Sequence, residues 1–169
     1  MLASRLLVAA RRDALNVCRT GPLAPFLSET PLFVVGAEPL TVADESLAVL
    51  FAADRLQDVE DYRATLQSWF RAVRTGGHLV LVVPHAFLYE RQLELPSRWN
   101  TAQKRLYTPA TLLEEVEEAL TPNTYRVRYV GDGDAGYDYG ASPDREPQGR
   151  SDVLLALQKI GRASCRERV

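Results

Sequence analysis

The histidine that follows the most apolar stretch of the chain is the first candidate for chemistry. The stretch RTGGHLVLVVPH, residues 74–85, ends its apolar run at Pro84 and His85. A neutral imidazole accepts a proton near pH 7, so His85 could act as a catalytic base or contact a substrate. On that interpretation its replacement costs little stability. The alternative is a polar strand-end residue without a chemical role. His78, which begins the run, is predicted to be structural.

A long polar and aromatic loop follows His85 and reaches about Tyr107. Loops of this length inside a compact domain are more often functional than idle. One interpretation is a lid over an acidic or sugar-like substrate, with Arg98 as a bidentate anchor. The other is a solvated loop that packs through Trp99 and Tyr107. On the first interpretation the substrate-binding residues are Tyr89, Arg98, Asn100, Lys104 and Tyr107.

Strands and helices alternate in the part of the chain that must position these residues. The apolar runs Leu32 to Val35 and Leu47 to Ala53 predict strands, and the second is apolar at every position, as in a strand covered on both faces. A helical stripe then runs from Tyr62 to Val73. We expect Gly76 or Gly77 to close that helix in the left-handed conformation before a two-sided strand over His78 to Val83.

The second half continues the pattern. Thr108 and Pro109 predict a helix start, as N-cap and first helical residue. Its glutamates, Glu114, Glu115, Glu117 and Glu118, are predicted to form a solvated face. Strands over Thr124 to Val130 and Val153 to Leu157 are predicted to pair as an antiparallel hairpin. The fold class is therefore α/β, with a mainly parallel sheet that ends in a hairpin. Ligands of such sheets bind beyond the carboxyl ends of the strands.

The ordered motifs resemble one known family. The run LFVVGAEPLTVADESLAVLFAADRLQDVED is similar to the third strand, polar turn and fourth strand of class I S-adenosylmethionine-dependent methyltransferases. The run SWFRAVRTGGHLVLVVPH is similar to their helix, double-glycine turn and fifth strand. The resemblance implies a Rossmann-like methyltransferase sheet, S-adenosylmethionine as cofactor and a small-molecule, sugar or lipid acceptor. It also implies a cofactor-binding set of Gly36, Ala37, Glu38, Ala53 and Asp54, beside His85 as the candidate catalytic residue from its own chemistry.

The departures from this family concern the cofactor. Its members hold the methionine end with a glycine-rich loop after the first strand, because only glycine allows so close a backbone approach. Before Leu32 this chain has a single glycine, Gly21. We therefore expect this polypeptide to bind S-adenosylmethionine weakly or not at all. The family's acidic residue for the ribose has no counterpart that can be placed, and Ala48 stands where its fourth strand commonly has Asp.

Two accounts of the N-terminal part stay open. In one, Met1 is an internal start and the first strand with its loop is missing, so the chain is a fragment of a methyltransferase. In the other, Arg5 to Ala10 is a degenerate first strand. The corresponding functions are a methyltransferase-type domain whose intact parent is active, and a non-catalytic methyltransferase-like module for interaction or regulation.

Length and composition set the remaining limits. The chain has 169 residues, which is room for one domain, and its 46% hydrophobic residues are enough for a packed core. The net charge of −2, without a basic run interleaved with aromatics, argues against a nucleic-acid partner. No apolar run is long enough for a membrane span. Cys18 and Cys165 make no metal or disulfide pattern, so we expect a cytoplasmic protein without a metal.

The last ten residues, 160–169, differ in character from the rest. Their sequence, IGRASCRERV, has no apolar periodicity and resembles one frame of a translated sequencing-library adapter. We therefore expect a single domain over residues 1–159 followed by a non-native tail. The alternative is a genuine basic tail that binds an acidic partner.

Overall fold

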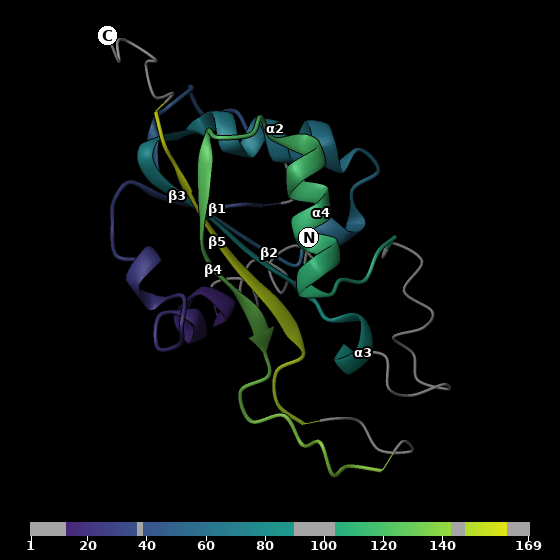
Figure 1. The fold of residues 1–169 in the computed structure, drawn as a ribbon. Helices are drawn as coiled ribbons and strands as arrows, with labels where there is room; N and C mark the ends of the chain where they lie inside the picture. Colours follow the sequence, from purple (N-terminus) through teal and green to yellow (C-terminus); the bar gives the residue numbers. More distant parts are fainter. Residues whose placement is uncertain (1–12, 37–38, 90–103, 143–147, 162–169) are drawn as a thin grey trace, which may run out of the picture.

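The core of the protein is a five-stranded mixed sheet. The computed structural model describes residues 13–36, 39–89, 104–142 and 148–161, and Figure 1 shows their arrangement. The strand order is β1-β2-β3-β5-β4. β1, β2 and β3 are parallel, and β5 runs antiparallel to both β3 and β4, so four strands share one direction. The strands are β1 (Leu32–Val34), β2 (Leu47–Ala53), β3 (Val73–Pro84), β4 (Tyr125–Gly133) and β5 (Asp152–Lys159).

Helical segments cover both faces of this sheet. α2 (Tyr62–Ala72) and α4 (Pro109–Ala119) pack on the face formed by Leu79, Leu81 and Val83. The opposite face, with Val80 and Val82, is covered by a helical segment at residues 13–18 and by the turn η1 (Ala24–Phe26). This division confirms the alternation predicted for the strand. The short elements η2 (Leu56–Asp58) and α3 (Ala86–Tyr89) follow the carboxyl ends of β2 and β3. No helix in the described part of the chain is long and apolar enough to cross a membrane.

Both main helices begin where the sequence predicts. The Asp61 carboxylate accepts from the Ala64 amide at 2.9 Å and caps α2. Thr108 caps α4, since its hydroxyl accepts from the Thr111 amide while the Thr111 side chain accepts from the Thr108 amide. Such caps satisfy backbone donors that a helix start otherwise leaves without partners.

The double glycine has a different role from the one predicted. α2 ends at Ala72, and Val73 is already extended, so neither glycine closes the helix. Instead β3 makes a bulge: it advances from Val73 to His78 while β2 advances only from Leu47 to Val49. Gly76 has a φ of +84°, which confirms that one of the pair needs the left-handed region. A Cβ on Gly77 would lie 2.6 Å from the carbonyl oxygen of Ala48, so the second glycine permits close strand contact.

The C-terminal hairpin is inserted into the sheet. β4 and β5 pair antiparallel, as predicted, but β5 also pairs with β3 over its whole length, from His78 with Gln158 to Pro84 with Asp152. The sequence did not predict this second pairing. It buries β5 between two neighbours and leaves β4 at the sheet edge, with Val127 43% exposed.

Leu81 provides the test of the two-sided strand. Its side chain is fully buried in the core under α2 and α4. Leu81→Ala should lower the free energy of unfolding by about 2–5 kcal/mol, because the deleted atoms leave a cavity. Val127→Ala on the exposed edge strand is the control and should cost less than about 1 kcal/mol. Chemical denaturation measures both, and similar costs for the two variants would contradict the assignment of Leu81 to the core.

The two glycines give a second test. Gly77→Ala should cost at least about 2 kcal/mol, since the new methyl group meets backbone oxygens that cannot move independently of the sheet. Gly76→Ala should cost about 1 kcal/mol, because its Cβ would enter open space and only the positive φ is unfavourable. Thermal denaturation compares the variants. A larger loss for Gly76→Ala would show that the bulge is built differently.

Candidate functional site

The carboxyl ends of the parallel strands meet at one edge of the sheet, next to α3 and the β4–β5 loop in Figure 1. Backbone hydrogen bonds hold these ends together. The Val35 amide donates to Phe51, the Asp54 amide to Val82, and the His85 amide to Ser151, at 2.8–3.0 Å. The predicted positions 36, 54 and 85 therefore follow three neighbouring strands at the edge where ligands of α/β sheets bind.

A cavity of about 370 Å³, here called the Gly36 cavity, lies beyond β1 and β2. A Cβ at Gly36 would meet no other atom within 4 Å, so this part of the cavity is open up to the backbone. Asp54 leaves β2 with a φ of +51°, a left-handed conformation that is uncommon for a residue with a side chain and often marks a functional edge. The cavity is lined by Val35, Gly36, Pro39, Leu40, Arg55, Val59, Ala64, Thr65, Ser68 and Trp69.

The other predicted cofactor residues are placed less directly. The Ala53 side chain is buried in the core on the second face of the sheet, so only its backbone is available at the edge. Ala37 and Glu38 lie outside the described residues. Gln57, in η2, is 5% exposed, and its side-chain oxygen has no hydrogen-bond partner among the described residues.

His85 has a more enclosed environment than expected. It is 7% exposed, and its Nδ1 accepts from the amides of Phe87 and Leu88 at 3.1 and 3.4 Å. The proton is therefore on Nε2, which donates to Asp132 Oδ1 at 3.0 Å. Both ring nitrogens are engaged, so His85 holds the start of α3 and orients Asp132. The sequence predicts that its replacement costs little stability, whereas these contacts give the side chain a role in holding the fold.

The predicted substrate-binding residues have four different placements. Tyr107 belongs to the core: it is 1% exposed, and its hydroxyl donates to Glu115 Oε2 at 2.8 Å. This corrects its assignment as a substrate contact. Lys104 is exposed and pairs with Glu60 at 2.5 Å, which leaves its predicted role open. Tyr89 lies in α3 at the expected edge. Arg98 and Asn100 lie outside the described residues.

Glu115 is not part of a solvated face. Its side chain is 16% exposed, and burial raises its pKa, although Tyr107 and Arg105 both favour the charged form. The Arg105 guanidinium lies 3.2 Å from the Glu115 carboxylate and also donates to the carbonyls of Leu56 and Val59. Arg105 thus joins the end of the long loop to the backbone of η2 and its neighbour Val59 on one side and to Glu115 of α4 on the other.

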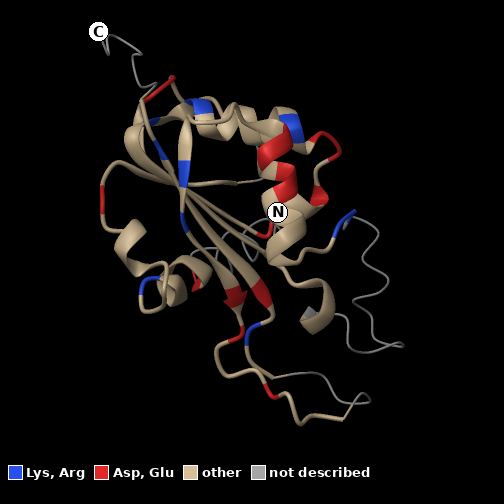
Figure 2. Cartoon of the chain, in the orientation of Figure 1, with Lys and Arg blue, Asp and Glu red and all other residues tan. Residues whose placement is uncertain are grey.

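The second face of the same edge carries acidic side chains at the ends of β4 and β5 (Figure 2). Asp132 ends β4 with its side chain 50% exposed. At the start of β5, Asp152 accepts from Arg150 at 2.6 and 2.9 Å, and burial raises the pKa of the Asp152 carboxyl against the effect of that guanidinium. Cys18 lies near this pair, and burial raises the pKa of its thiol, so it is not an activated nucleophile.

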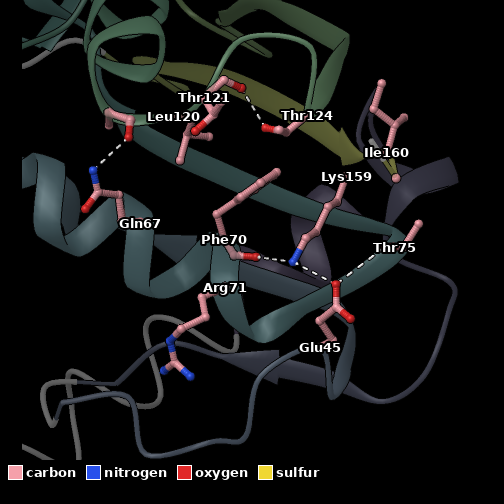
Figure 3. A pocket seen from close by; sticks show the side chains of 12 residues that line it. Glu45, Gln67, Phe70, Arg71, Thr75, Leu120, Thr121, Thr124, Lys159 and Ile160 are labelled. Carbon is pink, nitrogen blue, oxygen red and sulfur yellow. Dashed lines mark hydrogen bonds and ion pairs between the residues drawn. The ribbon is translucent and has the colours of Figure 1, made fainter. Parts of the chain in front are cut away.

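The cavity at the opposite end of the sheet is a less suitable site, although its volume of about 420 Å³ is larger (Figure 3). Its polar groups satisfy one another. Lys159 Nζ donates to the carbonyls of Phe70 and Val73 and lies 3.3 Å from the Glu45 carboxylate. The Gln67 amide donates to the carbonyl of Ala119. These contacts cap the ends of α2 and α4, and Arg71, which also lines the cavity, pairs with Asp44.

Known structures share this architecture. No protein-family model matches the sequence, and no curated protein matches it. A chain in the complex between the Haloferax volcanii Trm112 methyltransferase activator and a methyltransferase is similar, with a TM-score of 0.57 and 14% identity over 89% of this chain and 79% of that chain. A methyltransferase from Bacillus halodurans is similar with a TM-score of 0.53 and 12% identity, over 88% of this chain and 80% of that chain. An S-adenosylmethionine-dependent methyltransferase from Listeria monocytogenes is similar with a TM-score of 0.50 and 12% identity, over 75% of this chain and 68% of that chain.

The fold is therefore that of class I S-adenosylmethionine-dependent methyltransferases, as the sequence motifs predicted. The chain spans 62% of the length of another such structure, from Thermotoga maritima.

The position of β1 in the sheet differs from the prediction, which made Leu32 to Val35 the third strand of the family. Doubly wound sheets of order 3-2-1-4-5 place the first strand, not the third, beside the fourth. Because β1 pairs directly with β2, Leu32–Val34 occupies the first-strand position, and Gly36 begins the loop that follows it.

Sequence reasoning missed Asp132 as part of the edge, since its Asp-Gly-Asp context is typical of a surface turn. It also missed Cys18 and Arg150, which reach the edge through contacts distant in sequence. β4 continues to Gly133, beyond the predicted strand end at Val130, and this carries Asp132 to the edge.

His85 gives the test of this geometry. His85→Ala should lower the free energy of unfolding by about 1–3 kcal/mol, because two backbone donors of α3, one of them buried, lose their acceptor. Asp132→Asn is the matched control and should cost less than about 1 kcal/mol, since the side chain is half exposed and keeps an oxygen that accepts. Equal losses in urea denaturation, or a loss below about 0.5 kcal/mol for His85→Ala, would contradict the structural role.

Proposed function

We propose that this chain is an S-adenosylmethionine-dependent methyltransferase-type domain whose cofactor binds in the Gly36 cavity. Its intact parent transfers a methyl group to a small-molecule, sugar or lipid acceptor. The observation that carries this proposal is an open cavity in a methyltransferase fold, lined by Gly36 after β1 and by Arg55 just beyond the end of β2.

The position of β1 supports this site. Since β1 lies beside β2, the segment from Gly36 onward stands where the family places its glycine-rich loop. Gly36 is the only glycine in the segment GAEPLT, and Pro39 has no backbone N–H to donate. The segment therefore offers a ligand fewer backbone donors than a glycine-rich loop does. This supports binding at this site with low affinity.

The residues of the edge suggest a division of roles. Gly36 admits the cofactor to the backbone, and the Asp54 carboxylate is an acceptor for hydroxyl or amino groups. When bound, S-adenosylmethionine supplies an electrophilic methyl carbon, so the protein has to align the acceptor and take up its proton. His85 is not poised as the base, because its Nδ1 lone pair faces two backbone amides. We assign it the positioning of Asp132, whose carboxylate has further lone pairs for an acceptor.

Titration calorimetry with S-adenosylhomocysteine tests the proposal. We expect a dissociation constant between about 10 μM and about 1 mM, or roughly −7 to −4 kcal/mol. Gly36→Val should abolish binding, because its side chain would extend from the cavity wall at a position where a Cβ meets no protein atom within 4 Å. Gly161→Val, the same substitution at the other end of the sheet, is the control and should bind like wild type.

Three outcomes would contradict the proposal. A constant below about 10 μM would show that a single glycine suffices for tight binding. No binding at about 1 mM ligand would favour a non-catalytic relative. Normal binding by the Gly36→Val protein would move the cofactor to another part of the edge.

A further inference from the structure

A second cavity, here called the Cys18 cavity, lies on the other face of the sheet at the same edge. Its volume is about 340 Å³, within the range of sites for small ligands. It lies between the segment 17–22 and the adjoining ends of β4 and β5. Its lining residues are Val17, Cys18, Thr20, Gly21, Pro22, Tyr129, Asp132, Gly133, Asp134, Ala135, Arg150 and Leu154.

The inner walls of this cavity are apolar. Cys18 and Leu154 are each 5% exposed and belong to the core on this face. Because burial raises the pKa of the Cys18 thiol, that wall carries no charge at neutral pH. Val17 and Pro22 extend the apolar surface toward solvent, and the Tyr129 ring packs against the same core. Such walls suit the hydrocarbon part of a ligand.

The polar side of the cavity is negative. Asp132 and Asp134 both line it, and Arg150, a cation among its lining residues, is bound to Asp152. His85, neutral in its observed hydrogen-bonding pattern, donates to one oxygen of Asp132 and leaves the other available. Tyr139 donates to one oxygen of Asp134 at 2.5 Å. The four groups Asp132, Asp134, Arg150 and Asp152 carry three negative charges and one positive, a net of −2.

We propose that the Cys18 cavity binds a small amphipathic amine, with the ammonium group against Asp132 and Asp134 and the apolar body between Val17 and Leu154. The carboxylates supply charge-assisted hydrogen bonds, and the Tyr129 ring adds a surface that attracts a cation. That this amine is the methyl acceptor rests on the proposed function. An acidic acceptor, which the long loop alone favoured, would face two carboxylates at this end of the site.

A pair of probes tests the charge preference. Tyramine and 4-hydroxyphenylacetate share a phenol ring and differ in the charge at the other end. Ligand-observed NMR titrations of the full chain, without cofactor, should show tyramine binding at least about tenfold more tightly than the acid. Asp132→Asn should weaken tyramine binding at least about fivefold. Glu114→Gln, which removes one charge from an exposed side chain of α4, is the control and should leave the tyramine affinity unchanged.

A second variant guards against an indirect effect of the charge change. Val17→Trp, at a half-exposed wall position, should block tyramine without removing a carboxylate. Equal affinities for the two probes, or wild-type binding by both the Asp132→Asn and Val17→Trp proteins, would overturn the proposal.

The two proposals fail separately. The Asp132→Asn protein should keep its affinity for S-adenosylhomocysteine, and the Gly36→Val protein should keep its affinity for tyramine. If only cofactor binding fails, the proposed amine site is unaffected. If only tyramine binding fails, the proposed cofactor site is unaffected.

Discussion

Burial of the central strands on both faces is the constraint on which the rest of the structure depends. Every residue of β2 is buried, and so is β3 from Gly77 onward. Polar chemistry is therefore possible only where these strands end, because an unpaired polar group inside the sheet would lose its solvation. Both ends carry polar clusters, but they differ. At the amino end, Lys159 donates to the carbonyls of Phe70 and Val73 and Gln67 donates to that of Ala119, so these donors beside the cavity are already engaged. At the carboxyl end, cavities adjoin Gly36 and the half-exposed Asp132 carboxylate.

His85 shows how one side chain links the elements of that edge. Its amide pairs with the residue before β5, its Nδ1 caps α3, and its Nε2 reaches the end of β4. These contacts fix where α3 begins and where the Asp132 carboxylate points. The Arg105, Tyr107 and Glu115 network does the same for the end of the long loop. His85 and Tyr107, both predicted from the sequence as site residues, are thus engaged in contacts that hold the fold.

Local patterns predicted most of the secondary structure, and non-local contacts explain what they missed. Apolar periodicity and caps placed β2, β3, α2 and α4, because these signals lie within a few residues of the elements they define. The pairing of β5 with β3 and the contact between His85 and Asp132 join positions far apart in the chain. The bulge at Gly76 and Gly77 was misassigned to the helix end for the same reason. A close approach to Ala48 leaves no trace in the sequence beyond the glycine itself.

The central claim is that a methyltransferase cofactor binds at the carboxyl edge of β1 and β2. Backbone amide chemical shifts of the isotope-labelled chain, followed during titration with S-adenosylhomocysteine, test it most directly. The account predicts the largest shifts at Val35, Gly36, Asp54 and Arg55. The amides of Thr75, Thr121 and Lys159 around the opposite cavity should stay unchanged. Shifts that cluster at the opposite cavity would contradict it.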